Sequence, residues 1–187
     1  AKFLGQAYGL TRVPVVKGQS IPAYDPRAVK GVGVTYATTT MGADHTAGYS
    51  VTANILKVGG YINPLSKEGQ VDLSRNLQIA TAAVDSTGLC LFVAFCVLDN
   101  PEALPAVVEM LNAKNGTALT LDDVPALGKY VLSKERAFNC KAGFTAKDDR
   151  LPEFFSEEFA PHGVTWDLTG EELDELYNWD EAEEEAA

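Results

Sequence analysis

The sequence predicts a mainly α protein: a multihelical domain of about five to seven helices with no extended sheet. Apolar residues recur at helical spacings in residues 69–88 and again in residues 120–143. Residue pairs that favour a helix start, such as Asp25-Pro26, precede helical segments, and glycines that favour a helix end, such as Gly88, follow them. No series of strand-like segments competes with this pattern.

The chain divides into three predicted parts. Residues 1–24 contain several glycines and prolines and are expected to form an extended N-terminal segment. Residues 25–166 form the multihelical domain, and residues 167–187 form an acidic terminal helix or tail. The predicted elements are helices over 26–39, 69–88, 99–116, 120–143 and 170–186, an ambiguous segment over 46–58, a turn-rich loop over 59–64 and a salt-bridged loop over 147–152.

Some residues inside these elements have predicted packing roles. Gly31 and Gly33 would let another backbone approach the first helix closely. The terminal helix is expected to dock through an apolar stripe of Leu173, Leu176, Tyr177 and Trp179.

The segment from Leu89 to Leu98 is apolar on every side. It is too short to cross a membrane, which takes about 18 apolar residues or more, so we expect it to be buried in the core or at an interface. Nothing in the sequence indicates a secretory signal, and we expect no membrane partner.

The charge distribution excludes one class of partner. The net charge is −11, and residues 151–187 hold 13 acidic residues and no Lys or Arg. Residues 1–150 are close to neutral, so no basic field is present that could bind nucleic acid. The acidic end is interpreted as a solubilising tail, with an electrostatic dock for a basic partner as the alternative.

The three cysteines, Cys90, Cys96 and Cys140, show no paired spacing and no CxxC motif. An odd number without close pairs favours a reducing compartment, and we expect a cytoplasmic protein. Cys96 and Cys140 are predicted to be buried apolar residues.

The stretch Asp85-Ser86-Thr87-Gly88-Leu89-Cys90 combines groups that could carry chemistry. A carboxylate offers two acceptor oxygens to a ligand, and a cysteine after a turn can present a thiolate to a metal centre. The alternative is structural, because a cysteine after a helix end is often a small buried apolar residue.

Three further motifs accompany it: Gly42-Ala43-Asp44-His45 upstream, and Arg136-Ala137-Phe138-Asn139 and Asp148-Asp149-Arg150-Leu151-Pro152 downstream. His45 could donate a hydrogen bond or shuttle a proton, or it could be structural. Asp44 could simply cap the following helix. Arg136 and Asn139 could pack and hydrogen-bond inside the fold or support a nearby site.

In this order and spacing, the four motifs resemble the C-terminal domain of the tungsten-containing aldehyde:ferredoxin oxidoreductase family, over residues 24–152. The resemblance implies that Cys90 is the fourth ligand of a 4Fe–4S cluster. It also implies that Asp85, Gly88 and Leu89 contact a tungsten (or molybdenum) bis-pterin, with Asp85 accepting hydrogen bonds from the pterin ring, and that His45 is a catalytic residue beside the metal.

The implied activity is oxidation of small aldehydes to carboxylic acids with ferredoxin as electron acceptor. The chain lacks the family's first three cluster cysteines and its N-terminal pterin-binding domain, so we expect both cofactors to need upstream domains of the same polypeptide and the 187-residue chain alone to be inactive. The alternatives are a sister enzyme acting on aromatic acyl-CoA or carboxylic acids, and a non-catalytic helical interaction domain.

Overall fold

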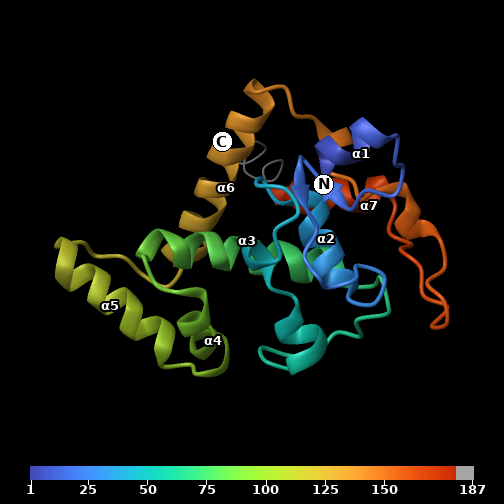
Figure 1. The fold of residues 1–187 in the computed structure, drawn as a ribbon. Helices are drawn as coiled ribbons and strands as arrows, with labels where there is room; N and C mark the ends of the chain where they lie inside the picture. Colours follow the sequence, from blue (N-terminus) through green and yellow to red (C-terminus); the bar gives the residue numbers. More distant parts are fainter. Residues whose placement is uncertain (180–187) are drawn as a thin grey trace.

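The computed structural model describes residues 1–179 and confirms a mainly α fold (Figure 1). Its α-helices are α1 (Lys2–Tyr8), α2 (Lys30–Thr38), α3 (Gln70–Thr87), α4 (Leu91–Asp99), α5 (Ala103–Asn115), α6 (Asp123–Lys141) and α7 (Gly170–Asp174). Short helical turns are η1 (Thr46–Gly48), η2 (Thr52–Leu56), η3 (Ala146–Asp148), η4 (Glu153–Ser156) and η5 (Glu175–Tyr177). The single sheet among these residues is an antiparallel ribbon of β1 (Val15–Val16) and β2 (Gln19–Ser20), in which Val16 pairs with Gln19.

Several predicted helix ends are observed. Gly88 ends α3 with a φ of 79°, and Gly116 ends α5 with a φ of 66°, both in the left-handed region that glycine adopts without strain. The first long helix begins later than the predicted residue 26. The carboxylate of Asp25 accepts hydrogen bonds from the backbone N–H and guanidinium of Arg27, which closes a turn ahead of Lys30, where α2 begins.

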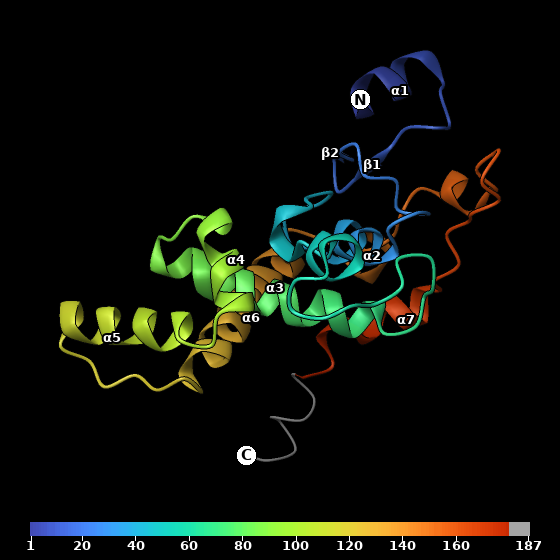
Figure 2. The same ribbon diagram turned by 90° about the horizontal axis from the view of Figure 1, so that it is seen from below.

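The N-terminal segment is less extended than expected. Residues 2–8 form α1, which ends at Gly9 with a φ of 65°, and β1 and β2 follow as a ribbon. Figure 2 shows α1 and the ribbon lying at one end of the molecule. Gly5 in α1 packs against Val13, where a Cβ would stand 2.4 Å from Cγ2 of the valine. This short helix packs against the segment that follows it, and the spacing of residues in the sequence does not reveal that contact.

The core is built around α2, whose nine residues are all buried. One apolar cluster includes Val34 of α2 together with residues of α3, α6 and α7, and a second includes Val32 and Tyr36 together with Val16 of the ribbon. Gly31 and Gly33 permit close packing, but side chains and not the predicted backbone approach them: a Cβ on Gly31 would stand 2.6 Å from Oε1 of Gln70, and one on Gly33 2.3 Å from the ring of Trp166. A helix buried on all sides must satisfy its polar groups through neighbouring side chains.

The predicted docking stripe of the C-terminal segment is confirmed. Its four residues are buried in the first core cluster: Leu173, Leu176, Tyr177 and Trp179. The part of the predicted terminal helix beyond residue 179 lies outside the described residues.

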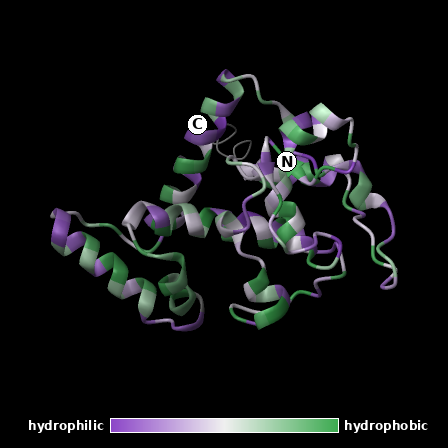
Figure 3. Cartoon of the chain, viewed as in Figure 1, coloured by the Kyte–Doolittle hydropathy of each residue, from purple (hydrophilic) through white to green (hydrophobic). Residues whose placement is uncertain are grey.

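The helices α4 and α5 lie at the opposite end of the molecule from α1 (Figure 1). Colouring by hydropathy shows that both are rich in apolar residues (Figure 3). Phe92 of α4 is 76% exposed, so the expected burial of residues 89–98 is not achieved within this chain. Within residues 1–179 no single helix is long and apolar enough to cross a bilayer, and α3 with α4 would meet that criterion only as a pair bent by 117°.

The prediction that Cys96 and Cys140 are buried is wrong, since both are exposed. Cys96 lies on α4, which packs on its neighbours through one face, and Cys140 lies in the last turn of α6. The apolar character of cysteine indicated burial, but the described residues provide no partner that covers these positions.

Gly128 marks the contact between α3 and α6. A Cβ at this position would stand 2.0 Å from the carbonyl oxygen of Ile79 in α3. We expect Gly128→Ala to force the helices apart and to lower the free energy of unfolding by about 1–3 kcal/mol, although alanine favours helices. Thermal or urea unfolding measures this. Ala126→Ser, at an exposed position of the same helix, is the control and should change stability little; an unchanged G128A protein would contradict the close packing.

Candidate functional site

A cavity of about 750 Å³ lies between the segment that follows α2, the C-terminal half of α3 and α6. This volume is in the range of small-molecule and cofactor sites, about 300–1,000 Å³. Three of the four sequence motifs contribute to its wall. The lining residues are Thr39, Thr40, Met41, Asp44, Thr46, Ala47, Gln78, Thr81, Ala82, Asp85, Ser86, Val131, Leu132, Lys134, Glu135, Phe138 and Asn139.

Three carboxylates line the cavity, and two of them already have partners. Asp44 accepts hydrogen bonds from the N–H and hydroxyl of Thr46 and from the N–H of Ala47. It therefore caps η1, as one interpretation of the sequence anticipated. Glu135 on α6 accepts a hydrogen bond of 2.7 Å from the hydroxyl of Thr40.

Asp85 is the carboxylate that stays open. Among the described residues no hydrogen bond or ion pair reaches its side chain. Asp85 is an exposed residue at the cavity, yet partial desolvation of its carboxyl raises its pKa above the ordinary value, and the negative charges of Asp44 and Glu135 raise it further. An open acceptor that is partly desolvated and repelled by its neighbours would gain from a ligand that donates N–H groups.

Cys90 lies just beyond this cavity and does not line it. The carbonyl of Asp85 accepts a hydrogen bond from the N–H of Gly88, which turns the chain, and Cys90 then precedes the first residue of α4. The thiol is exposed. Leu89, between them, lines a separate apolar cavity of about 210 Å³ enclosed by α3, α4, α5 and α6.

An exposed thiol is what a metal ligand shared with another part of a protein requires, but exposure alone does not distinguish Cys90. Cys96 and Cys140 are exposed as well, so thiol accessibility does not separate a ligand cysteine from the other two. Within residues 1–179 no group of three or more His, Cys, Asp or Glu side chains is arranged to hold a metal ion. A cluster bound through Cys90 would need ligands from elsewhere.

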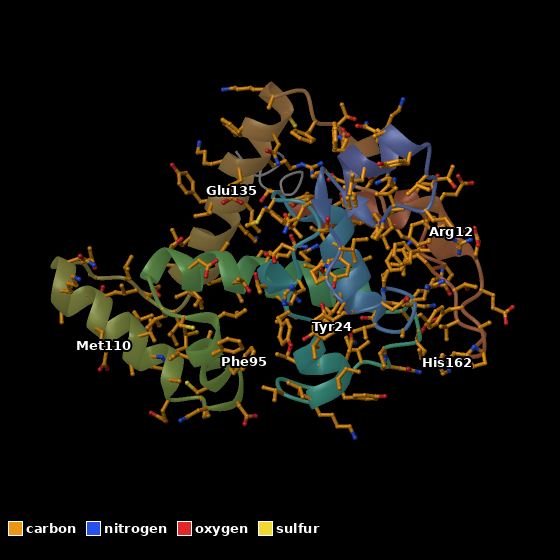
Figure 4. All side chains as sticks on the ribbon, in the orientation of Figure 1. Arg12, Tyr24, Phe95, Met110, Glu135 and His162 are labelled. Carbon is orange, nitrogen blue, oxygen red and sulfur yellow. The ribbon has the colours of Figure 1, made fainter. Side chains whose placement is uncertain are left out.

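His45 is adjacent to the cavity in sequence but does not line it. Its ring packs against Tyr24 and Tyr49, with centroids 5.4 and 5.8 Å apart, and its Nδ1 is buried without a hydrogen-bond partner, 3.9 Å from the Asp44 carboxylate. Tyr49 also stacks on Phe95 of α4. In the view of Figure 4, Tyr24 and Phe95 lie below α3, whereas Glu135 of the cavity lies above it.

The two tyrosines beside His45 are hydrogen-bonded to each other through their hydroxyls at 2.8 Å. Burial, together with this hydrogen bond, raises the pKa of Tyr49 to about 12, so the phenol of Tyr49 stays neutral at physiological pH. The structure thus places Asp44, Asp85 and Asn139 at one cavity, and places His45 in an aromatic contact that reaches the helix starting after Cys90.

The Arg-x-Phe-Asn motif has the internal role that the sequence allowed. Asn139 donates a hydrogen bond of 2.7 Å to the carbonyl of Thr40, and Arg136 lies over the ring of Tyr177 and 3.4 Å from Asp149. The salt-bridged loop over 147–152 is present, but Asp149 pairs with Lys17 and Arg136 from distant segments rather than with its neighbours in sequence.

Sequence reasoning did not single out Glu135, Gln78 or Lys17 in connection with the site. Each becomes relevant only when distant segments meet, so helical spacing gave no signal for the first two. For Lys17 a weak signal existed, because Lys17-Gly18 after two valines is typical of a tight turn between strands.

Comparison with known proteins agrees with the motifs. A family model described as aldehyde ferredoxin oxidoreductase, domains 2 and 3, matches residues 1–183. The chain belongs to this family.

Curated relatives include tungsten-containing aldehyde ferredoxin oxidoreductases of three archaea. The Pyrococcus furiosus protein is 35% identical over 163 residues and the Pyrococcus horikoshii protein 37% over 165, covering 86% and 87% of this chain. The Thermococcus kodakarensis protein is 36% identical over 151 residues, covering 79% of the chain. The chain spans about a quarter of the length of these relatives, 26%, 26% and 24% respectively.

The raised pKa of Asp85 gives a test of the cavity. The folded chain holds this proton more tightly than the unfolded chain does, so Asp85 lowers stability as the pH rises above its ordinary pKa of 3.8. We therefore expect Asp85→Asn to raise the melting temperature at pH 7, with the difference vanishing at about pH 3. Asp72→Asn, which breaks the ion pair with Arg75, is the control and should give no such gain. A lower melting temperature for D85N at pH 7 would show that Asp85 has a stabilising partner.

Proposed function

We propose that this chain is the cofactor-binding C-terminal part of a tungsten (or molybdenum) pterin, iron–sulfur oxidoreductase that oxidises aldehydes to carboxylic acids. The observation that carries the proposal is the segment from Asp85 to Cys90. It joins an open carboxylate in a ligand-sized cavity to an exposed thiol five residues further on. Membership of the family supports it, as does the similarity to relatives that are named tungsten-containing aldehyde ferredoxin oxidoreductases.

The residues present fit the pterin part of such a cofactor. A pterin ring carries N–H donors, and the cavity offers the acceptor-only oxygens of Asp85 without any internal donor to satisfy them. The cavity also has apolar wall residues, Val131, Leu132 and Phe138 of α6, that could pack against a flat ring. Gly88 and Leu89 would approach the group through the turn that ends α3.

The residues that line the cavity would contact the pterin and not the metal. When bound, the cofactors supply two-electron oxidation at the metal and one-electron steps through the cluster. This chain's share is to orient the pterin through Asp85 and to offer Cys90 as one of about four cluster ligands, the others coming from upstream domains of the same polypeptide.

His45 would act on protons. An imidazole has two nitrogens that can donate or accept hydrogen bonds. The ring of His45 is held by packing against Tyr24 and Tyr49, and its buried Nδ1 beside Asp44 has no hydrogen-bond partner. The ring could therefore turn toward a bound aldehyde or water without breaking a hydrogen bond of the fold.

Cysteine substitutions test the ligand assignment in the polypeptide that carries this chain together with its upstream domains. Cys90→Ser should remove one thiolate and cause loss of most of the cluster's iron, with loss of the electron paramagnetic resonance signal of the reduced cluster. Cys96→Ser and Cys140→Ser are matched controls, since all three thiols are exposed, and both should retain iron. Retention of a full cluster in C90S would exclude the assignment.

The isolated 187-residue chain should be inactive, because one cysteine cannot hold a cluster and a single cavity wall cannot enclose a bis-pterin. We expect no stoichiometric tungsten by elemental analysis and no dye reduction with small aldehydes, whereas the longer polypeptide shows both. Tungsten and turnover in the 187-residue chain would mean that the described residues contain a complete site.

A further inference from the structure

The end of α2 is held in an unusual way. The helices α1, α3 and α5 each end at a glycine in the left-handed region, which closes the helix locally. By contrast, α2 ends at Thr39, whose backbone is extended with φ −58° and ψ 146°. After Thr39 a local turn follows, in which the hydroxyl of Thr39 accepts from the N–H of Met41 and donates to the carbonyl of Gly42, and the chain then continues toward Asp44 and His45.

Four consecutive carbonyls at this end accept hydrogen bonds from distant side chains. The ammonium of Lys17 donates to the carbonyls of Ala37 at 2.9 Å and of Thr39 at 3.0 Å. The hydroxyl of Tyr177 donates to the carbonyl between them, that of Thr38, at 2.9 Å. Asn139, as described above, donates to the carbonyl of Thr40. The direction in which the chain leaves α2 is thus fixed by these tertiary contacts together with the local turn at Thr39.

Among these contacts, those of Lys17 carry the largest desolvation cost, because they bury an ammonium group. Its side chain is 4% exposed, and its φ of 48° is a left-handed conformation that residues other than glycine rarely adopt. Burial lowers the pKa of Lys17, while the ion pair with Asp149 opposes that shift. Burying an ammonium is unfavourable unless it is paired and fully hydrogen-bonded, and here it has one carboxylate and two carbonyl partners.

The ribbon that carries Lys17 also packs against the next part of the same loop. Gly42 has a φ of 117°, and a Cβ on it would stand 2.8 Å from the carbonyl oxygen of Val16. Val16 and Ala43 are both buried in the second core cluster. The ribbon therefore fixes residues 37–43 at both ends, immediately before Asp44 and His45.

We propose that Lys17 is a positioning residue that sets where the Asp44–His45 segment stands relative to the cavity and to α4. The proposal rests on the proposed function for its catalytic consequence, but the positioning itself belongs to this chain's own residues. Lys17 does not line the cavity itself; it acts through the carbonyls of Ala37 and of Thr39, which is one of the lining residues.

The test compares Lys17 with Arg75, because each side chain is bound to two backbone carbonyls and one carboxylate. Lys17→Met removes a cation bound to two backbone carbonyls and a carboxylate. The control Arg75→Met removes one with equivalent partners elsewhere, the carbonyls of Glu175 and Leu176 and the carboxylate of Asp72. Both variants are made in the polypeptide that carries this chain with its upstream domains.

The first readout is the rate at which diethyl pyrocarbonate labels His45, relative to His162 in the same molecules, measured by peptide mass. These are the only two histidines of the 187 residues, and His162 lies in the distant turn between Phe159 and Val164. We expect K17M to raise the ratio by about threefold or more, because a released segment exposes the ring, and R75M to leave it unchanged although it also destabilises the fold. The second readout is kcat with an aldehyde, which we expect to fall by about tenfold to a hundredfold in K17M and little in R75M.

An unchanged labelling ratio in K17M would overturn the proposal and make Lys17 a residue of stability alone, whatever the turnover. A raised ratio with unchanged kcat would overturn its catalytic consequence. If the parent polypeptide oxidises no aldehyde, the proposed function fails while the labelling ratio still decides the positioning. If K17M does not fold, Asp149→Asn, which keeps Lys17 but removes its countercharge, should raise the ratio in the same direction, and an unchanged ratio there counts against the proposal.

Discussion

The structure depends on one constraint: α2 is buried on every side, so its polar groups need partners inside the protein, which its threonines find and the buried hydroxyl of Tyr36 does not. Along the helix this is done by neighbours in space. The hydroxyl of Thr35 is 2.8 Å from that of Ser74, and the amide of Gln78 donates to the hydroxyl of Thr38 at 3.0 Å. These contacts fix α3 against α2, and α3 ends at the Asp85–Cys90 segment.

The same constraint determines the environment of the candidate site. At the C-terminal end of α2 the unpaired carbonyls draw side chains from the β1–β2 ribbon, from α6 and from η5. The cavity is formed where that end, α3 and α6 meet. Asn139 lines the cavity and also holds the carbonyl of Thr40, whereas Arg136 packs on Tyr177 and Asp149 away from the cavity.

The other end of the molecule presents the opposite situation. In α4 the sequence is apolar on all sides, yet Phe92 and Val93 are exposed, and the thiols of Cys90 and Cys96 are accessible at this helix. Because the hydrophobic effect disfavours such exposure, this face is suited to contact with another part of a larger assembly. The length of the relatives, of which this chain spans about a quarter, is in keeping with that interpretation.

The sequence alone determined most of the long helices and the family, but not α1, the β1–β2 ribbon or the start of α2. The glycines after α3 and α5, the apolar stripe of the C-terminal segment and the small residues of α2 all follow from short-range rules of backbone conformation and helical spacing. The order of four motifs was enough to indicate the family, and Asp85 proved to lie in a cavity.

Only the tertiary structure decided which of these residues meet. It separated His45 from the cavity that Asp44 and Asp85 share, paired Asp149 with Lys17 instead of its neighbours, and left Cys96 and Cys140 exposed. Burial depends on what covers a residue, and ion pairs depend on which distant segments converge. Periodicity along a chain contains neither kind of information, whereas helix caps and apolar stripes are set within a few residues.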